Sequence, residues 1–304
     1  MLVWIVIKQI VISFLLMLIG VICYKKNILG TKVSESLSDF VLTIVSPALI
    51  LNACQITYSK ELVHNLLWAF AMSALSYFIV IILSNICIRK NRENYNIERF
   101  SIVYSNCGFI GIPIVSAIFG DEGVLYLTCY IAMFNILLWT HGVICMSGKI
   151  DRHQLTAILK CPTIIAIVVG LLSFGFKITY PEIIGKTICY VAEMNTPLAM
   201  IVAGISITEA DIRLALRQKR VYFLTILKLV VMPVLVWLAM LPFHLNEMVL
   251  MTIVLATGCP TGATGIMFAL RYHKDEQYAS EIFAVTTVFT VITMPLLIFI
   301  CTLC

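Results

Sequence analysis

The feature that most constrains this chain is a succession of apolar stretches, each close to a membrane thickness in length, separated by short polar loops. About 20 apolar residues cross the hydrocarbon core of a bilayer as a helix. With 61% hydrophobic and 12% charged residues, the chain has too few polar side chains to cover a water-exposed surface. We therefore expect an all-α, multi-pass membrane protein with ten transmembrane helices. The expected spans are residues 2–24, 36–56, 63–87, 100–119, 123–147, 158–178, 184–207, 220–241, 247–270 and 277–302.

Most of the 21 lysines and arginines fall in every second loop, whereas Lys60, Lys177 and Lys186 lie in the loops of the other side. The positive-inside rule places the basic loops in the cytoplasm. We therefore expect a protein of the cytoplasmic membrane with both termini outside the cytoplasm. The first apolar stretch lacks a basic leader and a small-residue cleavage site, so we expect it to span. Because the basic residues lie in these loops, the net charge of +5 reflects the orientation of the protein in the membrane, and we expect no nucleic-acid partner.

The two halves of the chain carry similar motifs. Pro47 in VSPALILNACQI corresponds to Pro197 in NTPLAMIVAGIS, and Pro113 in NCGFIGIPIV corresponds to Pro260 in TGCPTGATG. Each copy contains five expected spans, an odd number, so the second copy enters the membrane from the opposite face. We predict two inverted five-helix repeats. They cover residues 1–150 and 151–304.

Glycine and proline cluster in the middle of expected spans 4 and 9. In a helix interior glycine costs about 1 kcal/mol and proline about 3 kcal/mol relative to alanine. At membrane depth, irregular backbone is tolerated only when it is buried in protein or lines a cavity. We predict two discontinuous helices whose broken ends offer N–H groups to an anion; tight small-residue packing between unbroken helices is the alternative. The candidate substrate-binding residues at the breaks are Asn106, Gly108, Gly111, Pro113, Gly258, Pro260, Thr261 and Gly262.

These motifs resemble the auxin efflux carrier family in its bacterial branch, which is related to the plant PIN carriers and more distantly to the bile acid:sodium symporters. The resemblance rests on SPALILNA, NCGFIGIPIV, NTPLAMIVAG and the break in span 9, and it covers essentially the whole chain. By position, Asn106 and Pro113 match the first crossover of the family and Pro260 matches the second.

The resemblance implies a scaffold of spans 1, 2, 6 and 7 and a transport domain of spans 3–5 and 8–10, in which spans 4 and 9 cross. It also implies transport of an organic anion, which is auxin in plants and malonate or malate among bacterial members. The long central loop of the plant carriers is replaced here by the short segment Gly148–Ala157, which argues against auxin as the substrate.

Two ionisable residues are expected near the middle of the membrane, Glu193 in span 7 and Lys228 in span 8. Intramembrane charge is costly and points to function. Either the two side chains pair with each other, or Glu193 carries a coupling proton and Lys228 helps to hold the substrate anion. Asn52 and Asn195 flank the motif prolines and either link helices or face the substrate.

We expect a secondary active transporter for a small organic anion, such as a malate- or malonate-like dicarboxylate or another carboxylate, working by an elevator-type mechanism. An enzyme is not expected, because the spans contain neither paired aspartates nor an HExxH motif, and no metal ligands are predicted. The alternatives are a channel and a transporter-like nutrient sensor. No cofactor is expected; coupling to protons or sodium, uniport, and a homodimer in the lipid bilayer stay open.

Overall fold

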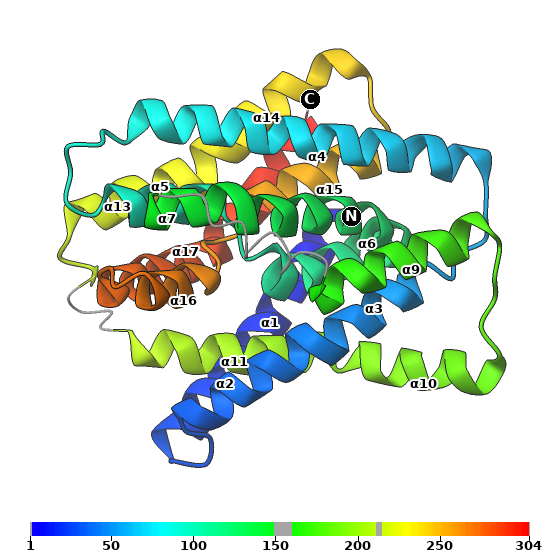
Figure 1. Ribbon diagram of the computed structural model, residues 1–304, viewed down its shortest axis with the longest axis horizontal. Helices are drawn as coiled ribbons and strands as arrows, with labels where there is room; N and C mark the ends of the chain where they lie inside the picture. Colours follow the sequence, from blue (N-terminus) through cyan, green and yellow to red (C-terminus); the bar gives the residue numbers. More distant parts are fainter. Residues whose placement is uncertain (1, 149–159, 211–214, 304) are drawn as a thin grey trace.

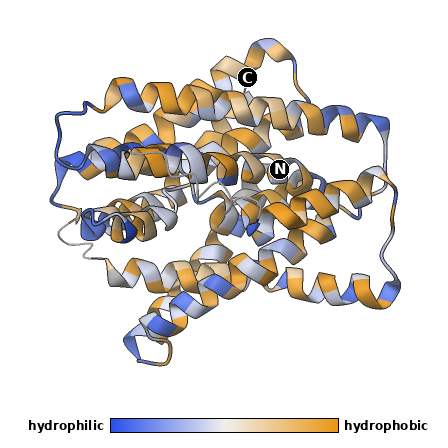
Figure 2. Ribbon diagram, viewed as in Figure 1, coloured by the Kyte–Doolittle hydropathy of each residue, from blue (hydrophilic) through white to orange (hydrophobic). Residues whose placement is uncertain are grey.

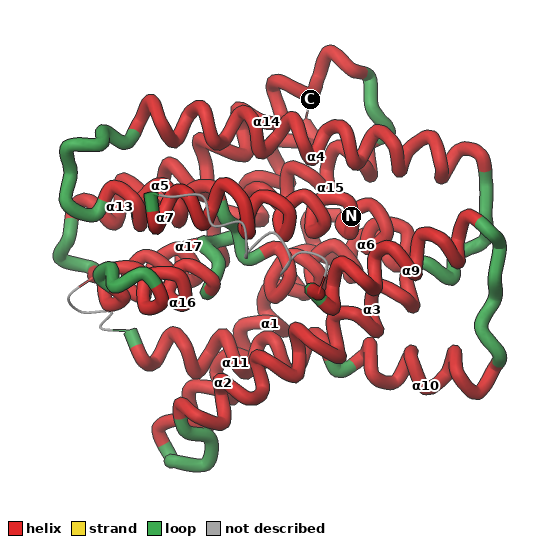
Figure 3. The backbone as a smooth tube through the Cα atoms, in the orientation of Figure 1, coloured by secondary structure: helices red, strands yellow, loops and turns green. Residues whose placement is uncertain are grey.

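The computed structural model describes residues 2–148, 160–210 and 215–303, which fold into helices joined by short connections. The expected boundary between the repeats, at residues 150 and 151, lies outside the described residues. No strand occurs among the described residues (Figure 3). The α-helices are α1 (Leu2–Lys25), α2 (Thr31–Phe40), α3 (Ser46–Ala53), α4 (Lys60–Cys87), α5 (Tyr95–Val103), α6 (Ile112–Leu137), α7 (Val143–Ser147), α9 (Pro162–Gly175), α10 (Glu182–Glu193), α11 (Asn195–Glu209), α13 (Lys219–Ile226), α14 (Met232–Met240), α15 (Glu247–Gly258), α16 (Thr264–Arg271) and α17 (Glu276–Leu303).

Within the described ranges, seven helical runs are long and apolar enough to cross a membrane. The longest single helices, α4 and α17, have 28 residues each and so extend about 42 Å at 1.5 Å per residue. Large apolar side chains cover their outer faces, with Leu67, Ile86 and Ile292 each more than 60% exposed. Figure 2 shows the same pattern, with apolar residues along the helices and hydrophilic residues at the turns. The expected multi-pass membrane protein is confirmed.

Three of the long runs pass through a proline by way of a short π-helical segment. Such segments end directly before Ser46-Pro47, Ile112-Pro113 and Met232-Pro233. Proline has no N–H to donate and its ring presses on the preceding turn, and a wider turn relieves both problems without ending the helix. The motif prolines Pro47 and Pro113 therefore mark local widening inside continuous helical runs.

The helical structure is interrupted at two places where the sequence predicts breaks, after α5 and after α15. After α5 the backbone becomes extended at Tyr104 (φ −96°, ψ 103°) and resumes as a π-helical turn, Cys107–Gly111, that leads into α6. After α15 it becomes extended at Cys259 (φ −59°, ψ 149°), and α16 begins only at Thr264. Within α6 the backbone turns sharply at Gly120 (φ 61°, ψ −151°), a conformation that favours glycine.

The two interruptions lie against each other in the interior of the protein. Ser105 and Thr261 form an isolated antiparallel bridge, and the backbone N–H of Asn106 donates to the carbonyl of Pro260 over 2.7 Å. Each interruption thus supplies partners for backbone groups that the other leaves outside a helix, which is what a low-dielectric interior requires. The alternative of unbroken helices with small-residue packing at these positions is wrong.

Small residues permit one close helix crossing elsewhere. A Cβ atom at Gly20 of α1 would overlap the carbonyl of Ile201 in α11, and one at Gly204 of α11 would overlap the carbonyl of Met17 in α1. Only glycine allows two backbones to approach this closely. Helices α1, α2, α3 and α11 lie together in Figure 1, while α4, α14 and α15 lie on the opposite side of the molecule.

Candidate functional site

A cavity of about 1060 Å³ is lined by one group of helices, α2, α3, α9 and α11, and by a second group, α6, α16 and α17. It reaches the surface beside Thr31, Arg271 and Glu276, which are exposed, and extends inward to Ser46 and Ile50 of α3. Cavities of this size accommodate small-molecule ligands, and they occur preferentially where two structural units meet. The outer end of the cavity lies at the end of the molecule that carries the basic loop residues Lys26 and Lys274.

One wall of the cavity is a polar stripe along α2 and the run that continues it into α3. Ser34, Ser38, Thr43 and Ser46 follow one another at spacings of three to five residues and all line the cavity. Residues three or four apart lie on the same face of a helix, so the stripe follows the run from the mouth of the cavity to its inner end. Hydroxyl groups of this kind can donate to and accept from a ligand.

The facing wall is largely aromatic and aliphatic. Phe134 of α6, Trp139 of the following π-helical segment (Leu138–Gly142) and Phe268 of α16 line it. Trp139 and Phe268 are in contact, with ring centroids 5.8 Å apart. Asn135 adds a polar group to this wall, and its Oδ1 accepts a weak bond from Cys161 Sγ at 3.5 Å. Hydroxyl groups thus line the cavity along α2 and α3, while aromatic rings line it from α6, the segment after α6, and α16.

Both interruptions border the cavity through a few residues each. Cys107 and Gly108 line it from the first interruption, and Ala263 and Thr264 line it from the second. Gly108 is therefore the only member of the predicted set at the breaks that lines this cavity. The other predicted residues at the breaks lie behind its surface, and they are Asn106, Gly111, Pro113, Gly258, Pro260, Thr261 and Gly262.

The carbonyl end of α5 receives its hydrogen bonds from the second half of the chain. Thr261 Oγ1 donates to the Ser101 carbonyl over 3.1 Å, and Lys228 Nζ donates to the Ile102 carbonyl over 2.9 Å. The last carbonyls of a helix have no partner within it, and they carry partial negative charge that favours a nearby cation. Lys228, which is 1% exposed, therefore caps α5 instead of facing the cavity.

Whereas Lys228 is buried, Glu193 lies on the surface of the protein. It ends α10 with an exposed side chain, and its carboxylate accepts from Cys189 Sγ of the same helix at 3.8 Å. Because Lys228 donates to the Ile102 carbonyl, the predicted pairing of Glu193 with Lys228 is wrong. The role of Glu193 as carrier of a coupling proton stays a prediction.

The two predicted asparagines differ in their surroundings. Asn195 is 1% exposed and its Oδ1 accepts from Ser46 Oγ over 3.1 Å, so it links α11 to α3 directly behind the polar stripe. Its Nδ2 has no hydrogen-bond partner among the described residues. Asn52 is half-buried on α3 and does not line the cavity.

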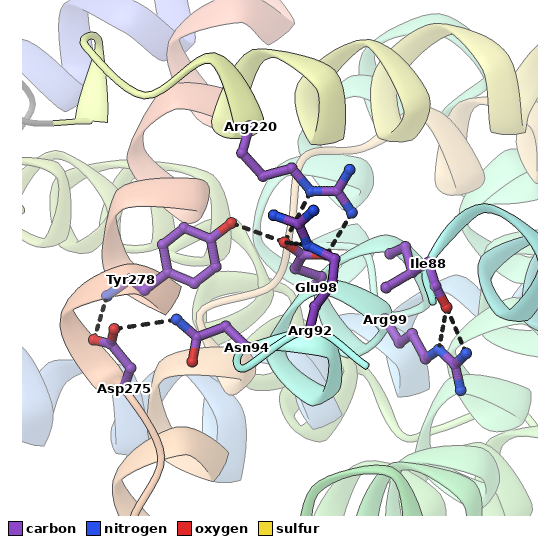
Figure 4. A network of polar contacts seen from close by, with 8 residues as sticks. All are labelled: Ile88, Arg92, Asn94, Glu98, Arg99, Arg220, Asp275 and Tyr278. Carbon is purple, nitrogen blue, oxygen red and sulfur yellow. Dashed lines mark hydrogen bonds and ion pairs between the residues drawn. The ribbon is translucent and has the colours of Figure 1, made fainter. Parts of the chain in front are cut away.

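A polar cluster holds α5 at the end of the molecule where the cavity opens (Figure 4). Glu98 of α5, whose side chain is 2% exposed, accepts two bonds from Arg220 of α13, at 2.9 and 2.6 Å. Its carboxylate also accepts from Tyr278 of α17 over 3.2 Å and lies 3.5 Å from Arg92. A bidentate pair of this kind fixes orientation as well as distance. The cluster therefore ties α5 to two helices of the second half of the chain.

Several residues around the cavity were not predicted as site residues, among them Ser46, Trp139 and Arg271. The polar stripe had a detectable signal, because TKVSESLSDF places hydroxyl and acidic residues on one face of a helix. The sequence gives no such signal for Trp139 and Arg271, since the two residues come together only through the packing of helices that are distant in the chain. Among the described residues no three His, Cys, Asp or Glu side chains are placed to hold a metal ion.

Comparison with known proteins identifies the family of the chain. A sequence model of the family described as membrane transport protein matches residues 5–158 and 150–298. The uncharacterized transporter MJ1031 of Methanocaldococcus jannaschii is 21% identical over 301 residues, which cover 94% of this chain and 96% of the relative. The uncharacterized transporter YfdV of Escherichia coli K12 is 25% identical over 204 residues, or 64% of each chain.

Proposed function

Because the chain belongs to the membrane transport protein family, the family of the auxin efflux carriers, we propose that it is a secondary transporter for a small organic anion. The observation that carries this proposal is the cavity between two groups of helices, which is bordered by both helix interruptions. Secondary transporters of this kind bind substrate at the interface between repeats, beside discontinuous helices.

We also propose ten membrane spans arranged as two inverted repeats. The seven long apolar runs, the two shorter apolar helices Pro162–Gly175 and Glu247–Gly258, and the interrupted helices support this arrangement. Support also comes from the direct pairing of the two interruptions through Ser105 and Thr261, since equivalent positions of two repeats meet at a shared axis.

In this proposal the scaffold consists of spans 1, 2, 6 and 7, and the remaining spans form a transport domain that moves against it as an elevator. The polar stripe then belongs to the scaffold, and Phe134, Trp139 and Phe268 belong to the transport domain. Because the cavity opens at the end with the basic loops, the positive-inside rule makes this an inward-open arrangement with both termini outside the cytoplasm.

An anion fits the chemistry of the interruptions. The segment from Cys107 and helix α16 both begin beside the cavity, and the N-terminal end of a helix offers N–H groups and partial positive charge. We therefore propose a malate- or malonate-like dicarboxylate, or another carboxylate, as the substrate. Transport occurs in the cytoplasmic membrane, by coupling to protons or sodium or by uniport.

The test is uptake by proteoliposomes that contain the purified protein. Labelled malonate, malate and benzoate are offered with and without imposed pH and sodium gradients. We expect saturable uptake of at least one anion, with counterflow when the same anion is loaded inside. Transport of a neutral or cationic solute without transport of any of these anions would overturn the substrate class. Flux that fails to saturate and shows no counterflow would indicate a channel, and binding without flux would indicate a sensor.

A further inference from the structure

Arg271 stands out among the residues of the cavity. It lies in the last turn of α16, its side chain is exposed, and it is the only lysine or arginine among the described residues that lines the cavity. Lys228 is enclosed behind the interruptions, and the neighbouring Lys274 is exposed but lies outside the cavity. An anion inside the cavity therefore meets one cationic side chain.

Aromatic rings hold this guanidinium in place. Its central carbon lies 5.9 Å from the ring centroid of Trp139, which also lines the cavity, and 5.9 Å from that of Tyr272. A guanidinium stacked on an aromatic face keeps its N–H edge free for a carboxylate, in a planar fork that matches the two carboxylate oxygens. Arg271 forms no ion pair with any described residue, so this edge is not already occupied by an acidic side chain.

Arg271 lies at the opposite end of α16 from the second interruption. Helix α16 has eight residues, so Thr264 at its start and Arg271 at its end are separated by about 10 Å along the helix axis. Both residues line the cavity, and the Oγ1 atom of Thr264 is buried without a hydrogen-bond partner among the described residues. One helix therefore carries a cationic side chain near the mouth and, at its inner end, a hydroxyl without a partner among the described residues.

Acidic residues in the same cavity restrict where an anion can bind. Glu35 and Asp39 of α2 and Glu276 of α17 also line it, so the lining repels anions except where Arg271 compensates. We propose that Arg271 is the side chain that recognises a carboxylate group of the substrate when it enters from the basic side of the membrane. This proposal rests on the proposed function, since it names the residue of that same site that recognises the anion.

The experiment uses the full-length protein in proteoliposomes and compares each anion with its uncharged amide. Uptake of labelled malonate or benzoate, whichever the wild type transports faster, is inhibited with malonate and malonamide or with benzoate and benzamide. These pairs are similar in shape and differ in charge, so the ratio of their inhibition constants reports recognition of the carboxylate. The variants are Arg271→Gln, Arg271→Lys and, as a matched control, Lys274→Gln.

We expect the wild type to prefer the anion over the amide and Arg271→Gln to reduce this preference about tenfold, as for the loss of a hydrogen bond to a charged group. Arg271→Lys keeps the charge and loses the planar fork, so it reduces the preference by about threefold. Lys274→Gln leaves it unchanged.

An unchanged preference in Arg271→Gln, with wild-type amounts of folded protein, would overturn the assignment. A fall in maximal rate with the preference intact would do the same, because it would indicate a structural role only. A wild type that transports a neutral or cationic solute and none of malonate, malate and benzoate would instead refute the proposed function, and this result is visible before any variant is made.

Discussion

The two helix interruptions look alike in the sequence and differ in the structure. At the first, the carbonyl end of α5 is held by Thr261 and by the ammonium of Lys228, and the start of α5 is held by the cluster around Glu98. At the second, the helix that follows carries Thr264 and Arg271 into the cavity. We infer that the first interruption is mainly an anchor, while the second leads into a helix whose side chains line the cavity. Variants can test this division, because an anchor affects stability and a binding element affects affinity.

The largest effect is expected from Glu98→Gln. Removing one partner of a buried ion pair typically costs about 3–5 kcal/mol, and because Arg220 is 24% exposed we expect about 3 kcal/mol. The matched control is Glu182→Gln, which removes an exposed pair with Lys186 on α10 and is expected to cost less than about 1 kcal/mol. The measurement is the thermal unfolding midpoint in detergent. Equal midpoints for the two variants would show that the cluster does not anchor α5.

A smaller loss of stability is expected from Lys228→Met. It leaves the Ile102 carbonyl buried without its donor, a loss of about 1–3 kcal/mol that is partly offset because a buried charge is also removed. We expect a lower unfolding midpoint and an unchanged KM for the transported anion, with Lys274→Met as the exposed control. A raised KM with an unchanged midpoint would contradict the capping role and restore the substrate-binding role predicted from the sequence.

Two glycines of the π-helical segment Cys107–Gly111 differ in the space around them. A Cβ atom at Gly111 would lie 3.2 Å from Cys259 Sγ of the second interruption, whereas one at Gly108 would meet no atom within 4 Å. We expect Gly111→Ala to destabilise by about 1 kcal/mol, because overpacking shifts one interruption against the other. Gly108→Ala keeps the stability and affects uptake, because Gly108 lines the cavity. Unfolding midpoints and initial uptake rates are measured for both variants, and an unchanged uptake rate in Gly108→Ala would show that the cavity is not the substrate path.

Much of this architecture is accessible from sequence because membrane folding rules are local. Span length follows from hydropathy, and the clusters around Gly108 and Gly262 predict interruptions because helices tolerate neither glycine nor proline well. The partners of Lys228 and Glu193 were not accessible in this way. Depth along a helix can be counted, but the direction of a side chain depends on how helices rotate and pack. Asn195 illustrates the same limit, because its bond to Ser46 joins residues that are 149 positions apart.

The smallest effect on stability, and the most direct test of the second interruption, is expected from Thr264→Val. The substitution keeps the shape of the side chain and removes a hydroxyl that is buried without a partner among the described residues. The free energy of unfolding is therefore expected to stay within about 0.5 kcal/mol of wild type. If this hydroxyl donates to the bound anion, its loss raises KM about tenfold, as for a hydrogen bond to a charged group. Thr257→Val is the matched control, because that hydroxyl lies in α15, donates to the Ile253 carbonyl of its own helix and does not line the cavity. Equal KM values for both variants would mean that the start of α16 does not contact the substrate, and the second interruption would then be an anchor like the first.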